Sequence, residues 1–314
     1  MEYVKLKNAD LVVSRIGLGC EPLGGADWGY VDERAAEATV CKALDLGINL
    51  FDTADVYGLG LSETRLSRAL GPHRHKVTII TKFGVNWKKV PGLERAVTFR
   101  DSSPAHVVEA LENSLRRLRI DCIPIYCIHW PDPKTPICDT IEALQKCQQQ
   151  GKIRYIGLSN FPLDLVRQVH SISPLGAVEL QYNLLNRELE AEITACYAEI
   201  GVSVVAYGML AQGFLTGKYG ADAYFPQTDR RCRLPHFKPP NLQRNLAFIE
   251  KLRKVANARG KTPAQVAIRW VLDNPNIACG IVGAKTPDQI ETNASAVGWN
   301  LTPEEYKFLA EPLP

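Results

Sequence analysis

The sequence lacks the features of several specialised classes of protein. Its 37 Lys and Arg residues nearly balance 34 Asp and Glu residues, and a formal charge of +3 over 314 residues gives no broad field for nucleic acid or anionic lipid. No apolar run approaches the ~18 residues of a membrane span, and no basic segment followed by an apolar one marks a signal peptide. We therefore expect a cytoplasmic globular protein with neither a nucleic-acid partner nor a membrane partner. The oligomeric state stays open.

Patterns for metals and disulfides are also missing. The nine cysteines include no C-x-x-C pair and no regular spacing, and several lie in apolar or helical runs. Such cysteines are typical of small buried hydrophobic residues in a reducing compartment. His73 and His75 form the only close pair of histidines, and they lie between a predicted helix and a predicted strand. We predict no metal site.

Short apolar runs alternate with amphipathic segments along the whole chain. The apolar runs predict buried parallel strands at Arg15–Leu18, Leu50–Asp52, Val77–Lys82, Ile123–His129, Arg154–Ser159, Ala177–Gln181, Val202–Tyr207 and Ala278–Val282. The amphipathic segments predict helices at Glu33–Leu46, Leu61–Leu70, Pro104–Leu118, Thr140–Gln150, Leu163–His170, Glu188–Ile200, Ala264–Asn274 and Asp288–Ala296. Eight alternations suit a (β/α)₈ TIM barrel or a doubly wound sheet. Because no G-x-G-x-x-G follows the first strand, we favour the barrel, as one domain over residues 1–314.

Turn and cap residues add detail to this barrel. Thr262, Thr286 and Thr302 each precede a proline and predict helix starts, with Glu305 completing a capping box for Thr302. Gly47, Gly151 and Gly201 are predicted to end helices.

The two ends of the barrel are predicted to differ. Val4–Leu6 and Leu11–Val13 predict an N-terminal β-hairpin that plugs one end. The long connections Phe83–Ser103 and Gly208–Asn241 both follow strands, so both are expected at the C-terminal face, where barrel active sites lie. We expect a substrate pocket there, with Trp28, Trp87 and Trp130 as an aromatic wall.

Four polar residues are expected to meet at that face. Asp52, Lys82 and His129 each close a predicted strand, and Tyr57 follows Asp52 by five positions. A carbonyl that receives a hydride becomes an alkoxide and needs a proton, which a tyrosine can supply. A neighbouring lysine favours the phenolate and so makes the proton easier to release, while Asp52 balances the lysine charge. His129 can orient the substrate oxygen.

Each of these residues alone has an ordinary structural explanation. Asp52 can form a turn, and Lys82 can extend to solvent. His129 can be a loop histidine, and Tyr57 can pack at the rim. Their joint position at strand ends favours a catalytic group.

The motifs around these residues carry a resemblance to a known family. They occur in family order as Phe51-Asp52-Thr53-Ala54-Asp55-Val56-Tyr57-Gly58, Thr81-Lys82, Ile128-His129, Gly157-Leu158-Ser159-Asn160-Phe161, Gln181-Tyr182-Asn183, Gly213-Phe214-Leu215-Thr216-Gly217-Lys218 and Gly283-Ala284-Lys285-Thr286. The sequence resembles the aldo-keto reductases, in the branch of bacterial enzymes, sugar reductases and potassium-channel β-subunits. The resemblance implies NADPH-dependent reduction of aldehyde or ketone substrates, including sugars and their derivatives.

The resemblance also implies roles for individual residues. Asp52, Tyr57, Lys82 and His129 would form the catalytic tetrad, with Tyr57 as the general acid. The residues implied in cofactor binding are Ser159, Asn160 and Gln181 at the nicotinamide carboxamide, Tyr207 on its ring, Leu210, Gly213 and Lys218 along the pyrophosphate, Gly283 and Lys285 at the 2′-phosphate, and Gln289 and Asn293 at the adenosine.

The chain departs from the family pattern at three places in the cofactor region. Lys285 stands where many relatives have Arg, Thr292 where many have Glu, and Gly208 follows Tyr207 where Ser is usual. A lysine at the phosphate still favours NADP over NAD, although it lacks the planar fork of an arginine.

The sequence leaves three other functions to compare with this one. A regulatory subunit of the channel-β type would hold the cofactor with little turnover. A metal-dependent barrel enzyme is disfavoured, because His73 and His75 belong to the opposite face of the barrel. A serine hydrolase is disfavoured, because Ser159 is not in a G-x-S-x-G motif.

Overall fold

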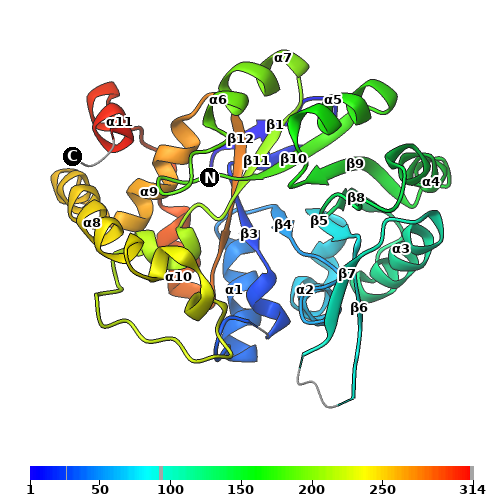
Figure 1. Ribbon diagram of the computed structural model, residues 1–314, viewed down its shortest axis with the longest axis horizontal. Helices are drawn as coiled ribbons and strands as arrows, with labels where there is room; N and C mark the ends of the chain where they lie inside the picture. Colours follow the sequence, from blue (N-terminus) through cyan, green and yellow to red (C-terminus); the bar gives the residue numbers. More distant parts are fainter. Residues whose placement is uncertain (26, 92–94, 312–314) are drawn as a thin grey trace.

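Eight parallel strands form a closed barrel in the computed structural model, which describes residues 1–25, 27–91 and 95–311 (Figure 1). Around the barrel the strands are β3 (Ile16–Gly19), β4 (Leu50–Asp52), β5 (Thr78–Phe83), β8 (Ile123–Ile128), β9 (Ile153–Ser159), β10 (Leu175–Gln181), β11 (Val204–Tyr207) and β12 (Ile277–Gly283). Each strand overlaps one predicted apolar run. The predicted TIM barrel is therefore confirmed.

Helices surround the strands, with α8 and α3 on opposite sides of the view in Figure 1. Their bounds are α1 (Glu33–Asp45), α2 (Leu61–Leu70), α3 (Pro104–Leu118), α4 (Ile137–Gln149), α5 (Leu163–Ile172), α6 (Glu190–Glu192), α7 (Ala198–Ile200), α8 (Asn241–Ala258), α9 (Pro263–Asp273), α10 (Pro287–Ala294) and α11 (Pro303–Ala310). The predicted helix Glu188–Ile200 begins two residues later, and Ile193–Tyr197 between α6 and α7 is π-helical. Helix α8 was not predicted. Among its helices, the described part of the chain contains none with the length and apolar character needed to cross a bilayer.

The predicted caps explain where these helices begin and end. The hydroxyls of Thr262, Thr286 and Thr302 each accept a backbone N–H of the first helical turn, and Thr302 forms the predicted capping box with Glu305. Gly47, Gly151 and Gly201 have φ values of 80°, 74° and 75°, the left-handed conformation that ends a helix most easily at glycine. These cap predictions are confirmed.

The N-terminal hairpin closes one end of the barrel. Strands β1 (Tyr3–Lys5) and β2 (Val12–Ser14) pair antiparallel, with Val4 opposite Val13. The hairpin and the barrel interior share one apolar cluster of Leu6, Ala9, Leu11, Val13, Leu50, Ile80, Ile125, Cys127, Ala177, Val205, Cys279 and Ile281. Full burial of one such leucine side chain contributes about 1.5–3 kcal/mol. The predicted plug is confirmed.

The two long connections lie at the other end of the barrel, because they follow β5 and β11. The first contains an antiparallel hairpin that was not predicted, β6 (Val85–Lys88) and β7 (Val97–Arg100). Residues 92–94 of this predicted connection lie outside the described residues. The second contains the short helical turns η4 (Ala211–Thr216), η5 (Arg230–Arg233) and η6 (Pro235–Phe237). Near its middle, the backbone N–H of Arg230 donates to the carbonyl of Asp27 at 2.9 Å, which joins this connection to the loop after β3.

Candidate active site

All fifteen predicted site residues line one cavity at the C-terminal end of the barrel. Its volume is about 1,320 Å³. The residues in question are Asp52, Tyr57, Lys82, His129, Ser159, Asn160, Gln181, Tyr207, Leu210, Gly213, Lys218, Gly283, Lys285, Gln289 and Asn293. Residues spread over more than 200 positions of sequence meet here because the carboxyl ends of all eight strands face the same side.

A buried cluster of one ammonium group and two carboxylates forms the floor of this cavity. The Nζ atom of Lys82 forms an ion pair with Asp52 Oδ2, lies 3.3 Å from Glu179 Oε2, and donates to the carbonyl of Thr53 at 3.0 Å. The exposed fractions of Lys82, Asp52 and Glu179 are 2%, 5% and 1%. One buried cation is therefore paired with two buried carboxylates. The cluster carries a net negative charge when all three groups are ionised.

The electrostatics of the cluster follow from this uneven count. Burial acts against the charge of Lys82, but Asp52 and Glu179 together raise its pKa well above the ordinary value. Burial and the neighbouring Glu179 raise the pKa of Asp52 well above its ordinary value, and Lys82 only partly offsets them. Lys82 is thus held as a cation, while the two carboxylates compete for it.

Tyr57 and His129 stand beside the cluster. The Nζ atom of Lys82 lies 5.4 Å from the centre of the Tyr57 ring, and the rings of Tyr57 and His129 meet edge to face with centroids 5.7 Å apart. Burial raises the pKa of Tyr57 well above its ordinary value, although Lys82 lowers it. Lysine has the predicted direction of effect, but burial and the carboxylates outweigh it. The phenol therefore keeps its proton at neutral pH.

His129 is uncharged in this environment. It follows β8 directly, and burial, reinforced by the positive charge of Lys82, lowers the pKa of its imidazole well below the ordinary value. Its Nδ1 atom is buried without a hydrogen-bond partner among the described residues. A neutral imidazole can form a hydrogen bond with a carbonyl oxygen without placing a second cation beside Lys82.

Asn160 links four of the strands that line the cavity. Its Nδ2 atom donates to the carbonyl of His129 and to Ser159 Oγ, both at 3.0 Å, and its Oδ1 atom accepts from the Tyr207 hydroxyl at 2.6 Å. Its backbone N–H donates to the carbonyl of Glu179 at 3.1 Å. The residue holds these contacts at a φ of 63°, a left-handed conformation that costs a non-glycine residue free energy and is common at functional sites.

Two glycines hold the Tyr57 loop against the loop after β3. A Cβ atom placed on Gly58 would lie 2.2 Å from the carbonyl oxygen of Gly24, and one on Gly24 would lie 2.7 Å from the nitrogen of Gly58. Gly58 also has a φ of 60°. The backbone N–H of Ser62 donates to the carbonyl of Tyr57 at 3.1 Å. Backbone contact at this distance requires glycine at both positions.

Replacing Gly58 by alanine is therefore expected to lower the free energy of unfolding by about 2–3 kcal/mol, since the new methyl group meets fixed backbone. Urea unfolding followed by circular dichroism measures this change. Gly201→Ala is the matched control, because Gly201 has a similar φ of 75° but nothing within 4 Å of the added Cβ. We expect a loss of about 1 kcal/mol there. Equal losses in the two variants would contradict the close-packing argument.

Cationic side chains gather at the end of the cavity formed by β12 and α10. The Nζ atom of Lys285 bonds to the carbonyl of Trp28, and its backbone N–H donates to Gln289 Oε1 at 2.8 Å. Gln289 thus bonds to Lys285 and does not complete a capping box with Thr286. Burial and the nearby charges of Arg231 and Lys218 lower the pKa of Lys285. The three cations Lys285, Arg231 and Lys218 outnumber the nearby carboxylates of Asp229 and Asp288, and surplus positive charge beside the first turn of a helix is suited to binding a phosphate.

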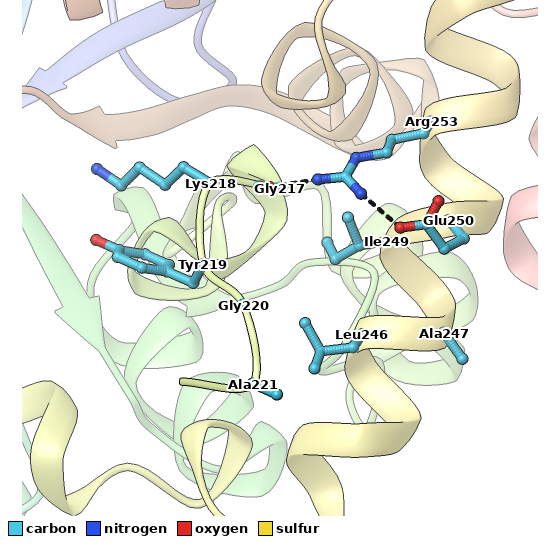
Figure 2. A pocket seen from close by; sticks show the side chains of 10 residues that line it. All are labelled: Gly217, Lys218, Tyr219, Gly220, Ala221, Leu246, Ala247, Ile249, Glu250 and Arg253. Atoms are coloured by element: carbon cyan, nitrogen blue, oxygen red, sulfur yellow. Dashed lines mark hydrogen bonds and ion pairs between the residues drawn. The ribbon is translucent and has the colours of Figure 1, made fainter. Parts of the chain in front are cut away.

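A second, smaller hollow of about 470 Å³ lies between residues 217–221 and helix α8 (Figure 2). Arg253 of α8 spans its upper side, donating to the carbonyl of Gly217 at 2.7 Å and pairing with Glu250. Figure 2 shows the side chains of Lys218 and Tyr219 directed away from α8. Lys218 therefore lines both hollows, with its side chain directed away from α8.

The predictions missed one residue at the floor of the cavity and misplaced another at its rim. Glu179 lies inside the predicted strand Ala177–Gln181, whereas the predicted catalytic charges all lie at strand ends. The sequence could have indicated it, because Glu179 is a charged residue in an apolar run and alternates with Ala177 and Gln181, which face the barrel interior. Of the three predicted wall tryptophans, Trp28 and Trp130 line the cavity, whereas Trp87 does not, because the hairpin of β6 and β7 contributes Val85, Thr98 and Arg100 in its place.

Comparisons with known proteins agree with the fold. The sequence matches the model of the Aldo/keto reductase family over residues 15–312. It is 37% identical over 310 residues to aldo-keto reductase YhdN of Bacillus subtilis, covering 98% of this chain and 92% of that protein. It is 34% identical over 305 residues to the Schizosaccharomyces pombe aldo-keto reductase yakc, whose name specifies NADP(+), covering 95% and 88%.

A solved structure extends this likeness to three dimensions. The glycerol dehydrogenase AKR11B4 of Gluconobacter oxydans matches with a TM-score of 0.90 and 38% identity, covering 99% of this chain and 97% of that one. Family match, relatives and structure agree over nearly the full length. The chain therefore belongs to the aldo/keto reductase family and is an NAD(P)H-dependent oxidoreductase.

Proposed function

We propose that the protein reduces aldehydes or ketones to alcohols with NADPH and that Tyr57 donates the proton. The observation that carries the proposal is the meeting of a protonated phenol, a buried ammonium group and a neutral imidazole on one wall of a cavity that extends to Lys285, just before helix α10. Small carbonyl compounds are the substrates, and sugars or sugar derivatives are the class that we favour.

The chemistry of the proposal rests on what each side chain can do. A bound reduced nicotinamide supplies the hydride. Tyr57 then gives its proton to the oxygen of the substrate, and the phenolate left behind is stabilised by the Lys82 ammonium beside it. Asp52 keeps Lys82 charged and fixed. The neutral imidazole of His129 forms a hydrogen bond with the carbonyl oxygen and orients it. General acid catalysis of this kind contributes about 10²–10⁴ in rate.

The residues of the cavity fit a nicotinamide dinucleotide. Ser159, Asn160 and Gln181 offer hydroxyl and amide groups beside Tyr207, and the buried Oε1 atom of Glu179 has no partner among the described residues. These groups would hold the nicotinamide carboxamide. Leu210, Gly213 and Lys218 would follow the pyrophosphate, Gly283 and Lys285 would bind the 2′-phosphate, and Gln289 and Asn293 would contact the adenosine.

The proposed activity is tested with the purified protein, NADPH and 4-nitrobenzaldehyde, by the loss of absorbance at the wavelength of the reduced nicotinamide. We expect steady turnover and stoichiometric formation of the alcohol. A protein that binds NADPH but turns over no aldehyde, ketone or sugar would instead fit the alternative of a regulatory subunit. That alternative is second because the four residues proposed for catalysis all line the same cavity.

The preference for NADPH is expected to depend on Lys285. Replacing it by methionine removes the cation nearest the proposed 2′-phosphate site, so the KM for NADPH should rise about tenfold or more, the size of a lost charged hydrogen bond. The KM for NADH should stay within about twofold, since NADH has no 2′-phosphate. Steady-state kinetics with both cofactors measure the difference. Equal changes for NADPH and NADH would contradict this assignment.

A further inference from the structure

The carboxylate of Glu179 is a feature of the cavity that proton donation by Tyr57 does not require. Lys82 already has Asp52 as a counter-charge, so a second buried acid adds a negative charge where desolvation opposes it. Removing one such acid is expected to relieve repulsion within the cluster, because Glu179 raises the pKa of Asp52. A buried acid that destabilises its own charge cluster is a candidate for binding a ligand.

The position of Glu179 indicates which ligand that is. It lies opposite Ser159 on β9 and opposite Val205 on β11, two residues before Gln181, which lies opposite Tyr207. Since alternate residues of a strand face the same side, Glu179 occupies the layer directly beneath Gln181 and Tyr207 in the barrel. It therefore lies under the part of the cavity that the proposed function assigns to the nicotinamide.

One buried acceptor here, Glu179 Oε1, has no hydrogen-bond partner among the described residues. Asn160 Oδ1 already accepts from Tyr207, and Ser159 Oγ already accepts from Asn160. Glu179 Oε2 lies against Lys82, whereas Oε1 is buried and without a partner among the described residues. An amide N–H₂ group placed here would find its acceptor in Oε1.

We propose that Glu179 makes the site distinguish the two redox states of the cofactor, by accepting a hydrogen bond from the nicotinamide carboxamide and placing a negative charge beneath the ring. The oxidised ring is a cation and the reduced ring is neutral, so the charge strengthens binding of NADP⁺ more than binding of NADPH. Bound NADPH is then a stronger hydride donor than free NADPH. This inference rests on the proposed function in one respect, namely that a nicotinamide binds over the cluster.

The test is the ratio of the dissociation constants of NADP⁺ and NADPH, measured by titration calorimetry without substrate. Glu179→Gln keeps the shape and the carbonyl acceptor but removes the charge. We expect the ratio of the NADP⁺ constant to the NADPH constant to rise about tenfold, because a unit charge within several ångströms in a buried site interacts strongly with a ring cation. Glu179→Met, which also lacks the acceptor, should raise the ratio similarly and weaken binding of both forms.

A matched control is available in helix α6. Glu190 bonds to Tyr182 and pairs with Arg187, away from the cavity, and Glu190→Gln should leave the ratio unchanged. A ratio within twofold of wild type in both Glu179 variants would overturn the inference. If wild-type protein binds both cofactor forms and reduces 4-nitrobenzaldehyde, such a result leaves the proposed function intact. Wild-type protein that binds neither form would overturn the proposed function and, with it, this inference.

Discussion

Replacing Tyr57 by phenylalanine is expected to lower kcat for NADPH-dependent aldehyde reduction by about a thousandfold or more. The substitution removes only the hydroxyl group, so the ring contact with His129 at 5.7 Å and the position beside Lys82 can remain. The alkoxide formed by hydride transfer would then have no side chain to protonate it, and general acid catalysis is worth about 10²–10⁴. Single-turnover oxidation of NADPH measures the effect on the chemical step.

Two further measurements separate loss of the proton donor from general damage. NADPH should bind the Tyr57→Phe variant with nearly wild-type affinity, because the phenol is assigned to the substrate. Tyr155→Phe is the control, since Tyr155 accepts from the backbone of Asp10 beside the N-terminal hairpin, at the other end of the barrel. Its kcat should be unchanged. A Tyr57→Phe variant that retains more than a tenth of the rate would rule out Tyr57 as the proton donor.

Replacing Lys82 by methionine is expected to lower the free energy of unfolding by about 3–5 kcal/mol and to abolish turnover. Removing one partner of a buried ion pair leaves an uncompensated charge, and here two carboxylates lose the same partner. Turnover fails because Tyr57 loses the cation that stabilises its phenolate. Urea unfolding at neutral pH measures the stability, and NADPH oxidation measures the activity.

The cause of this instability can be tested by removing a carboxylate as well. Adding Glu179→Gln to Lys82→Met should restore part of the stability, because less charge is then left unpaired in the barrel. Lys152→Met is the surface control, since Lys152 pairs with Glu112 where both side chains are over a third exposed. It should cost less than about 1 kcal/mol. A double variant no more stable than Lys82→Met would show that lost packing, not charge, is responsible.

The barrel could be predicted from the sequence because its signals are local and repeated. Each strand is a short apolar run buried on both faces, and each helix has caps such as Thr302 with Glu305. The hairpin of β6 and β7 was missed for a physical reason, since its residues 97–100 are mostly exposed and have no core to fix an alternation. Helix α8 was missed although Phe248, Ile249, Leu252 and Val255 recur at helical spacing and are buried.

The candidate site likewise contains residues that local sequence could identify and residues that require the three-dimensional structure. Asp52, Lys82 and His129 could be found because a polar residue at the end of a buried strand is unusual. Glu179 requires knowledge that the strand alternates into the barrel and that Lys82 reaches it from β5, three strands away around the barrel. The direction in which the pKa of Tyr57 shifts could not be foreseen either. It depends on how far burial, which raises this pKa, outweighs Lys82, which lowers it.

The hairpin of β1 and β2 determines from which end of the barrel a ligand can reach the cavity. Leu6, Leu11 and Val13 pack into the end of the barrel opposite the cavity, so the cavity is closed at that end. The cavity lies at the other end of the barrel, where both long connections contribute to its lining. Substitutions in the two long connections can therefore change which ligands enter the cavity, while the buried cluster of Lys82, Asp52 and Glu179 stays the same.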